Sequence, residues 1–141
     1  VALTVALLVV ACRPAGAQPC SRGDFEAAVG DAAQALRDLN QQNKPTFQAK
    51  LRQLKAKRGW SYDEFVAAAA PIVQDQTIAA YDEKSSAFLA RIEQLGAEGT
   101  SAASPDCKRL IEVRQSMQDL VEVQKAKWTY MFDRVTKELE R

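Results

Sequence analysis

The last third of the chain carries the most regular hydrophobic pattern, because its apolar residues recur at steps of three and four from residue 105 onward. This spacing places them on one face of an α-helix, and no Gly interrupts the run. Ser104 is a suitable N-cap, and Pro105 suits the first helical position. We therefore predict a helix over residues 105–141, roughly 55 Å long at 1.5 Å per residue. Its apolar face consists of Leu110, Val113, Met117, Leu120, Val121, Trp128, Met131, Phe132, Val135 and Leu139.

A second helical pattern runs over residues 21–58. It begins with a capping-box sequence, in which Ser21 precedes Asp24 by three residues. Pro45 lies inside the segment and cannot donate a backbone hydrogen bond, so we expect the helix to break there. Thr46 would cap a short restart that ends at Gly59. The apolar positions of this segment are Phe25, Ala28, Val29, Ala32, Leu36, Leu39, Phe47, Leu51 and Leu54.

A third helical pattern occupies residues 61–95. It also starts with a capping-box sequence, formed by Ser61 and Glu64. Pro71 should bend this helix, because its nitrogen has no hydrogen for the carbonyl four residues earlier. Small and polar residues then predict a loop over residues 96–104. The apolar positions of this segment are Phe65, Ala68, Ile72, Ala79, Phe88, Leu89, Ile92 and Leu95.

The three segments have nearly equal lengths and are joined by short connections, which favour antiparallel neighbours. No strand pattern outweighs the helical one. We predict an all-α fold, an up-down-up antiparallel bundle of three long helices whose first helix is broken near Pro45. In this topology the first and third helices start at the same end. That arrangement brings Cys20 and Cys107 within the distance of about 7 Å between Cα atoms that a disulfide requires.

The N-terminal segment resembles an export signal. Residues 1–10 are almost wholly apolar, which is too short for a membrane span but typical of a signal core. Cleavage after Ala17 would remove residues 1–17 as a signal peptide and leave residues 18–141 as a single domain. Alternatively, the residues before Cys12 resemble a lipoprotein box, and Cys12 would become a lipidated N-terminus. The charged start of a signal is absent and residue 1 is not Met, which indicates a truncated or misread gene start.

Both kinds of processing predict a periplasmic or secreted protein, with no transmembrane domain after the signal is removed. Cys20 and Cys107 then remain as an even pair in an oxidising compartment, where a disulfide is the expected state. Two cysteines without histidine seldom complete a zinc shell, so a metal site is not expected.

Composition removes several functional classes from consideration. The chain has no histidine among its 141 residues, which excludes the commonest general base and histidine-ligated haem. Its net charge of +1 gives no reason to expect nucleic acid as a partner. Met117 and Met131 lie on the helical face that would fill a core. The sequence therefore predicts no catalytic residue, no metal ligand and no cofactor.

One segment has a distinct charge. Residues 44–58 hold six basic residues and no acidic residue, and the basic side chains flank the apolar face on both sides. They can pair with the acidic segment 61–95, or bind an anionic surface such as a lipid headgroup, lipopolysaccharide or wall polymer. Aromatic residues should gather at the same end, opposite the disulfide. The basic patch consists of Lys44, Lys50, Arg52, Lys55, Lys57 and Arg58. The candidate binding residues are Lys50, Arg52, Lys55, Lys57, Arg58 and Trp60.

Two functional hypotheses follow. The first is a non-catalytic exported protein of the cell envelope that binds or scaffolds an unknown envelope protein or an anionic surface. The second is a small all-α secreted enzyme with a pocket of Arg, Lys and Gln, as in chorismate-mutase chemistry, which needs no histidine. The first helix lacks the Arg and Lys spacing that chorismate mutases use. The sequence therefore favours the non-catalytic hypothesis.

Overall fold

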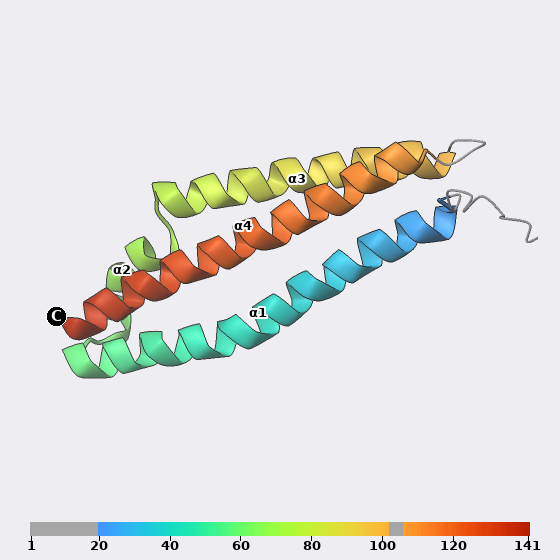
Figure 1. The fold of residues 1–141 in the computed structure, drawn as a ribbon. Helices are drawn as coiled ribbons and strands as arrows, with labels where there is room; N and C mark the ends of the chain where they lie inside the picture. Colours follow the sequence, from blue (N-terminus) through green and yellow to red (C-terminus); the bar gives the residue numbers. More distant parts are fainter. Residues whose placement is uncertain (1–19, 102–105) are drawn as a thin grey trace, which may run out of the picture.

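The computed structural model describes residues 20–101 and 106–141, and that part of the chain is all-helical without a strand. The predicted export signal, Cys12, Ser104 and Pro105 lie outside the described residues. The described part contains three long helices and one short helix, and Figure 1 shows how they are arranged. They are α1 (Arg22–Arg58), α2 (Tyr62–Val73), α3 (Gln76–Ser101) and α4 (Cys107–Glu140).

Helix α1 is continuous, so the predicted break near Pro45 is wrong. Figure 1 shows α1 as one curved rod. Pro45 has no N–H to donate to the carbonyl four residues earlier. Because Pro45 is exposed, water can bond to that carbonyl instead. Nearby side chains bond back to the helix as well, since Thr46 donates to the Gln42 carbonyl at 3.3 Å and Asn43 to the Leu39 carbonyl at 2.8 Å. Thr46 therefore does not cap a restart.

The helix predicted over residues 61–95 is divided into two, and the division lies beyond Pro71. Helix α2 includes Pro71 and ends at Val73, where Gln74 takes an extended conformation with φ −151°. Asp75 then starts α3, because its carboxylate accepts the backbone N–H of Ile78 at 2.8 Å. The predicted single rod with a bend at Pro71 is therefore wrong, because the chain forms two separate helices here.

The predicted loop over residues 96–104 is wrong over residues 96–101, because α3 continues to Ser101. Gly99 explains the extension: it is buried directly against the ring of Phe25, so this turn belongs to the packed interior. The start of α4 also differs from the prediction. Its N-cap is Asp106, whose carboxylate accepts the N–H of Lys108 at 2.9 Å.

Both predicted capping boxes are present. Ser21 caps α1 and accepts the N–H of Asp24 at 3.2 Å, and Ser61 caps α2 and accepts the N–H of Glu64 at 3.3 Å. The Ser21 backbone N–H, and then its hydroxyl, donate to Asp24 and lower the pKa of that carboxyl. The Ser61 backbone N–H lowers the pKa of Glu64 in the same way.

Helix α4 packs against both α1 and α3. It runs antiparallel to α3, because Arg91 pairs with Glu112 while the earlier Asp82 pairs with the later Lys127. It runs parallel to α1, because a disulfide joins their starts and Arg58 of α1 pairs with Glu138 near the end of α4.

The predicted disulfide between Cys20 and Cys107 is confirmed, with a Cα–Cα distance of 5.3 Å. It closes a loop across 87 residues of sequence and joins the start of α1 to the start of α4. Cys20 is buried, whereas Cys107 is exposed. The bond therefore fixes the end of the molecule at which the packing of α1 against α4 begins.

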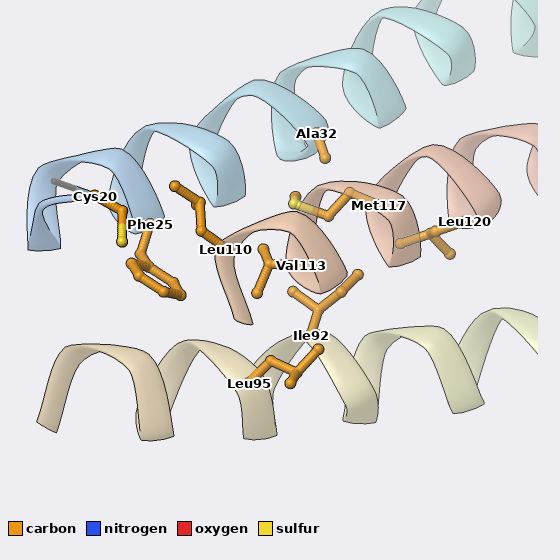
Figure 2. Close-up of a cluster of buried hydrophobic side chains, with 9 residues drawn as sticks. All are labelled: Cys20, Phe25, Ala32, Ile92, Leu95, Leu110, Val113, Met117 and Leu120. Carbon is orange, nitrogen blue, oxygen red and sulfur yellow. The ribbon is translucent and has the colours of Figure 1, made fainter. Parts of the chain in front are cut away.

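Two apolar clusters form the core. Figure 2 shows the cluster beside the disulfide, with side chains from α1, α3 and α4 directed into the space between the helices. It consists of Cys20, Phe25, Ala32, Ile92, Leu95, Leu110, Val113, Met117 and Leu120. The second cluster lies at the other end of the helices and consists of Phe47, Leu54, Ile72, Ile78, Met131 and Val135, with Trp60, Trp128 and Phe132 packed against it.

Replacing Gly99 with Ala should lower the free energy of unfolding by about 1–3 kcal/mol, because the new Cβ would overlap the ring of Phe25. Gly96→Ala is the matched control on the same helix. No atom lies within 4 Å of a Cβ at that position, so this variant should gain about 0.5–1 kcal/mol from reduced chain entropy. Urea denaturation followed by circular dichroism measures both changes. Equal effects of the two substitutions would contradict the packing described here.

Loss of the disulfide should lower the free energy of unfolding by about 2–4 kcal/mol, because the unfolded chain gains the freedom that the closed loop removes. The variant Cys20→Ser/Cys107→Ser is compared with the oxidised protein in a denaturant titration. The oxidised protein treated with reductant should match the variant. A midpoint that does not move in either case would contradict a stabilising role for this bond.

Candidate functional site

The predicted binding residues lie on the last four turns of α1 and the turn that follows. Phe47 and Leu54 face the second core cluster and are buried, which fixes the orientation of this part of the helix. The basic residues consequently emerge on its two flanks, at the end of the molecule opposite the disulfide. Their side chains differ in what they contact.

Lys57 and Arg58 contact the end of α4. Lys57 donates to the carbonyl of Leu139, and Arg58 donates to the carbonyl of Glu138 at 3.0 Å. The last carbonyls of a helix have no partner within the helix and carry partial negative charge. These two cations therefore satisfy the C-terminus of α4 and hold the ends of α1 and α4 together.

Lys55 and Trp60 contact aromatic and cationic groups at the same end. The Lys55 ammonium lies 5.8 Å from the ring centroids of both Tyr62 and Phe65, which belong to α2. The guanidinium of Arg58 lies 6.0 Å from the Trp60 ring. Trp60 is half-buried and packs against the second core cluster. The predicted gathering of aromatic residues at this end is therefore observed.

Lys44, Lys50 and Arg52 differ from the other basic residues of segment 44–58 in having no partner among the described residues. None of them makes a hydrogen bond, ion pair or ring contact with residues 20–101 or 106–141. Lys44 and Arg52 are exposed, and Lys50 is half-buried. No acidic residue occurs between residues 40 and 61 to neutralise them. These three cations are available to an external anion, and they are the part of the basic patch that the internal packing does not use.

A polar cluster that the sequence did not indicate lies where α3 begins. The carboxylate of Asp75 accepts hydrogen bonds from the Tyr130 hydroxyl at 2.7 Å, from Arg134 and from the Ile78 backbone. Tyr130 lies beside Tyr81, with ring centroids 6.3 Å apart. This cluster links the start of α3 to α4. The sequence signal was weak, because only Asp75 three residues before Ile78 marks a helix start and its partners are 55 and 59 residues away.

The surface has open hollows between the helices. One of about 430 Å³ lies between α1 and α4, with a floor that includes Ala32, Met117 and Val121. Arg114 and Lys125 stand on its rim, and carboxylates stand there too: Asp31 and Glu122. Lys125 pairs with Glu122 at 2.8 Å. The rim therefore has mixed charge and does not form an electropositive pocket.

The described part of the chain contains no cluster of acidic or cysteine side chains that could hold a metal ion. In the same residues, no helix is both long and apolar enough to cross a bilayer. Comparison of the chain with protein-family models, with curated proteins and with solved structures finds no match in any of the three.

Replacing Asp75 with Ala should lower the free energy of unfolding by about 1–3 kcal/mol, because three donors lose one half-buried acceptor. Glu112→Ala removes the exposed pair with Arg91 and is the matched control, with an expected cost of about 0–1 kcal/mol. Thermal and urea denaturation of the two variants give the comparison. If Asp75→Ala cost no more than the control, the cluster would not stabilise the junction between α3 and α4.

Proposed function

We propose that the protein is a non-catalytic, exported component of the cell envelope that binds an anionic partner through the basic end of α1. In this proposal α1, the α2–α3 pair and α4 are the three rods of an up-down-up bundle. The protein is periplasmic or secreted, either after cleavage behind Ala17 or anchored through a lipidated Cys12. The partner is an anionic surface or an acidic face of an envelope protein.

The observation that carries the proposal is that three cations of one segment, Lys44, Lys50 and Arg52, have no partner among the described residues. Paired charges on a protein surface usually neutralise each other, as Arg91 and Glu112 do here. A group of lysine and arginine side chains with no acid nearby attracts anions over about 8–10 Å at physiological salt. Residues 44–58 carry six cations and no acid, and of these cations Arg58 alone pairs with a carboxylate of the described residues, that of Glu138. The opposite face of this part of α1 is buried.

The alternative, a small all-α enzyme with a basic pocket, has one observation in its favour. Arg114, Gln118 and Lys125 line the hollow between α1 and α4, and these are the residue types that an electrophilic pocket would use. However, Asp31 and Glu122 share the rim and would oppose an anionic substrate. The mixed charge of the rim favours the binding function over this alternative.

Neutralising the three cations should release the protein from its own envelope. The variant Lys44→Gln/Lys50→Gln/Arg52→Gln is compared with wild type for retention on the envelope fraction of the source organism, with elution by increasing salt. The wild-type protein should be retained at low salt, and the variant should elute early, because three attractive charges are lost.

The matched control is Lys84→Gln/Lys108→Gln/Arg114→Gln, which removes the same charge from three exposed cations elsewhere on the molecule. It should be retained like wild type. Equal retention of the two triple variants would contradict a role for the basic end of α1.

A further inference from the structure

We propose that the anionic partner is a lipid bilayer, and that α2 lies against it with its exposed apolar face while the basic end of α1 binds the headgroups. This inference rests on the proposed function and names the partner of the same site. It assigns a binding role to α2, a helix that the charge pattern of the sequence did not single out.

Helix α2 exposes an unusual share of apolar surface for its length. The described residues include six large hydrophobic side chains that are exposed, and three of them belong to this helix of 12 residues. Tyr62 is 71% exposed, Val66 is 50% exposed and Val73 is 38% exposed. The other three are single residues on the long helices: Val29, Leu89 and Ile111. Scattered apolar residues are ordinary, whereas a group on one short helix indicates a contact surface.

The exposed residues of α2 lie on one face. Tyr62, Val66, Ala70 and Val73 follow one another at steps of four, four and three, which is the spacing of a single helical stripe. The buried residues Ala69 and Ile72 occupy the neighbouring face, toward the core. The apolar stripe therefore points out of the bundle, and none of residues 20–101 and 106–141 covers it.

Three cations form a basic stripe on α1, which meets the apolar stripe of α2 where Lys55 contacts Tyr62. Lys44, Arg52 and Lys55 lie eight and three residues apart, so they share one flank of α1. The Lys55 ammonium lies 5.8 Å from the Tyr62 ring centroid. Cations beside an apolar stripe that carries an aromatic residue are the pattern of a helix lying in a membrane interface.

The charge around α2 favours lipid over an uncharged surface. Six basic residues and no acidic residue lie between residues 40 and 61. Of the two acids on α2, Glu64 is held by the capping box and lies across the helix from Tyr62. Asp63 is exposed and lies between Tyr62 and Glu64 around the helix, so its negative charge should weaken binding to an anionic surface. Removal of the Asp63 charge therefore tests directly whether α2 approaches an anionic surface.

The shape of α2 favours lipid over a protein partner or a second copy of the chain. Anchoring side chains of a protein partner need a pocket, and three of the surface hollows lie along α1, α3 and α4 and include no residue of α2. A stable dimer buries about 800 Å² on each partner, which is more than one stripe of a helix about 18 Å long offers. Shallow burial in the headgroup region requires neither a pocket nor a large area.

The test is co-sedimentation of the purified, disulfide-bonded protein with vesicles. Vesicles of phosphatidylcholine containing 30% phosphatidylglycerol (roughly physiological anionic content) are compared with vesicles of phosphatidylcholine alone. Wild type should bind the anionic vesicles and not the neutral ones, and binding should fall as salt rises, because salt screens exposed charges.

Three variants separate the contributions. Lys44→Gln/Arg52→Gln should weaken binding roughly tenfold or more, since each cation at an anionic surface strengthens binding about fivefold. Val66→Asn/Val73→Asn should weaken it by a similar factor through loss of apolar burial. Asp63→Asn should strengthen it about fivefold. Lys84→Gln/Lys108→Gln is the matched charge control and should bind like wild type, and circular dichroism checks that every variant is folded.

The outcomes distinguish this inference from the proposed function. If the basic variant loses vesicle binding but the valine variant and Asp63→Asn bind like wild type, α2 does not contact lipid and the inference is overturned. If wild type binds no vesicles but is still retained on the envelope through Lys44, Lys50 and Arg52, the partner is a protein or a polymer and the inference is again overturned. If neither vesicles nor the envelope retain wild type, both proposals fall.

Discussion

Burial of the apolar face of α4 against α1 and α3 is the interaction on which the molecule depends. Val113, Leu120 and Val135 are almost completely inaccessible to solvent. The first two belong to the cluster beside the disulfide and Val135 belongs to the second cluster. Each such side chain contributes about 1.5–3 kcal/mol when it leaves water. An isolated helix of this length has no comparable source of stability. The orientation of α1 and α3 follows, because each must turn its own apolar stripe toward α4.

The surface chemistry at the end opposite the disulfide is a consequence of that packing. Once Phe47 and Leu54 face α4, the cations of residues 44–58 must leave on the flanks. Lys57 and Arg58 reach the terminal carbonyls of α4, where the helix dipole favours positive charge. Lys44, Lys50 and Arg52 have no such neighbour. The same helix therefore supplies both the closure of the bundle and a basic surface that the bundle does not neutralise.

Sequence motifs predicted the structure correctly where the residues that interact are close together in the chain. The capping boxes at Ser21 and Ser61 satisfy neighbouring backbone groups, and both form as expected. The two prolines were harder, because the effect of a proline depends on its surroundings. Pro45 is exposed in a helix held by long-range packing, and the helix continues. Pro71 lies four residues before Asp75, whose carboxylate starts a new helix, and the chain divides between them.

The sequence by itself determined the helical class, the long amphipathic segments, the basic segment and the pairing of Cys20 with Cys107, because periodicity, residue type and segment length fix these properties. Only the tertiary structure decided which cations stay unpaired, that Asp75 joins α3 to α4, and that α2 turns an apolar stripe outward. These properties depend on contacts between residues tens of positions apart. Such contacts form only when the helices pack together, so neither the hydrophobic periodicity nor a short motif predicts them.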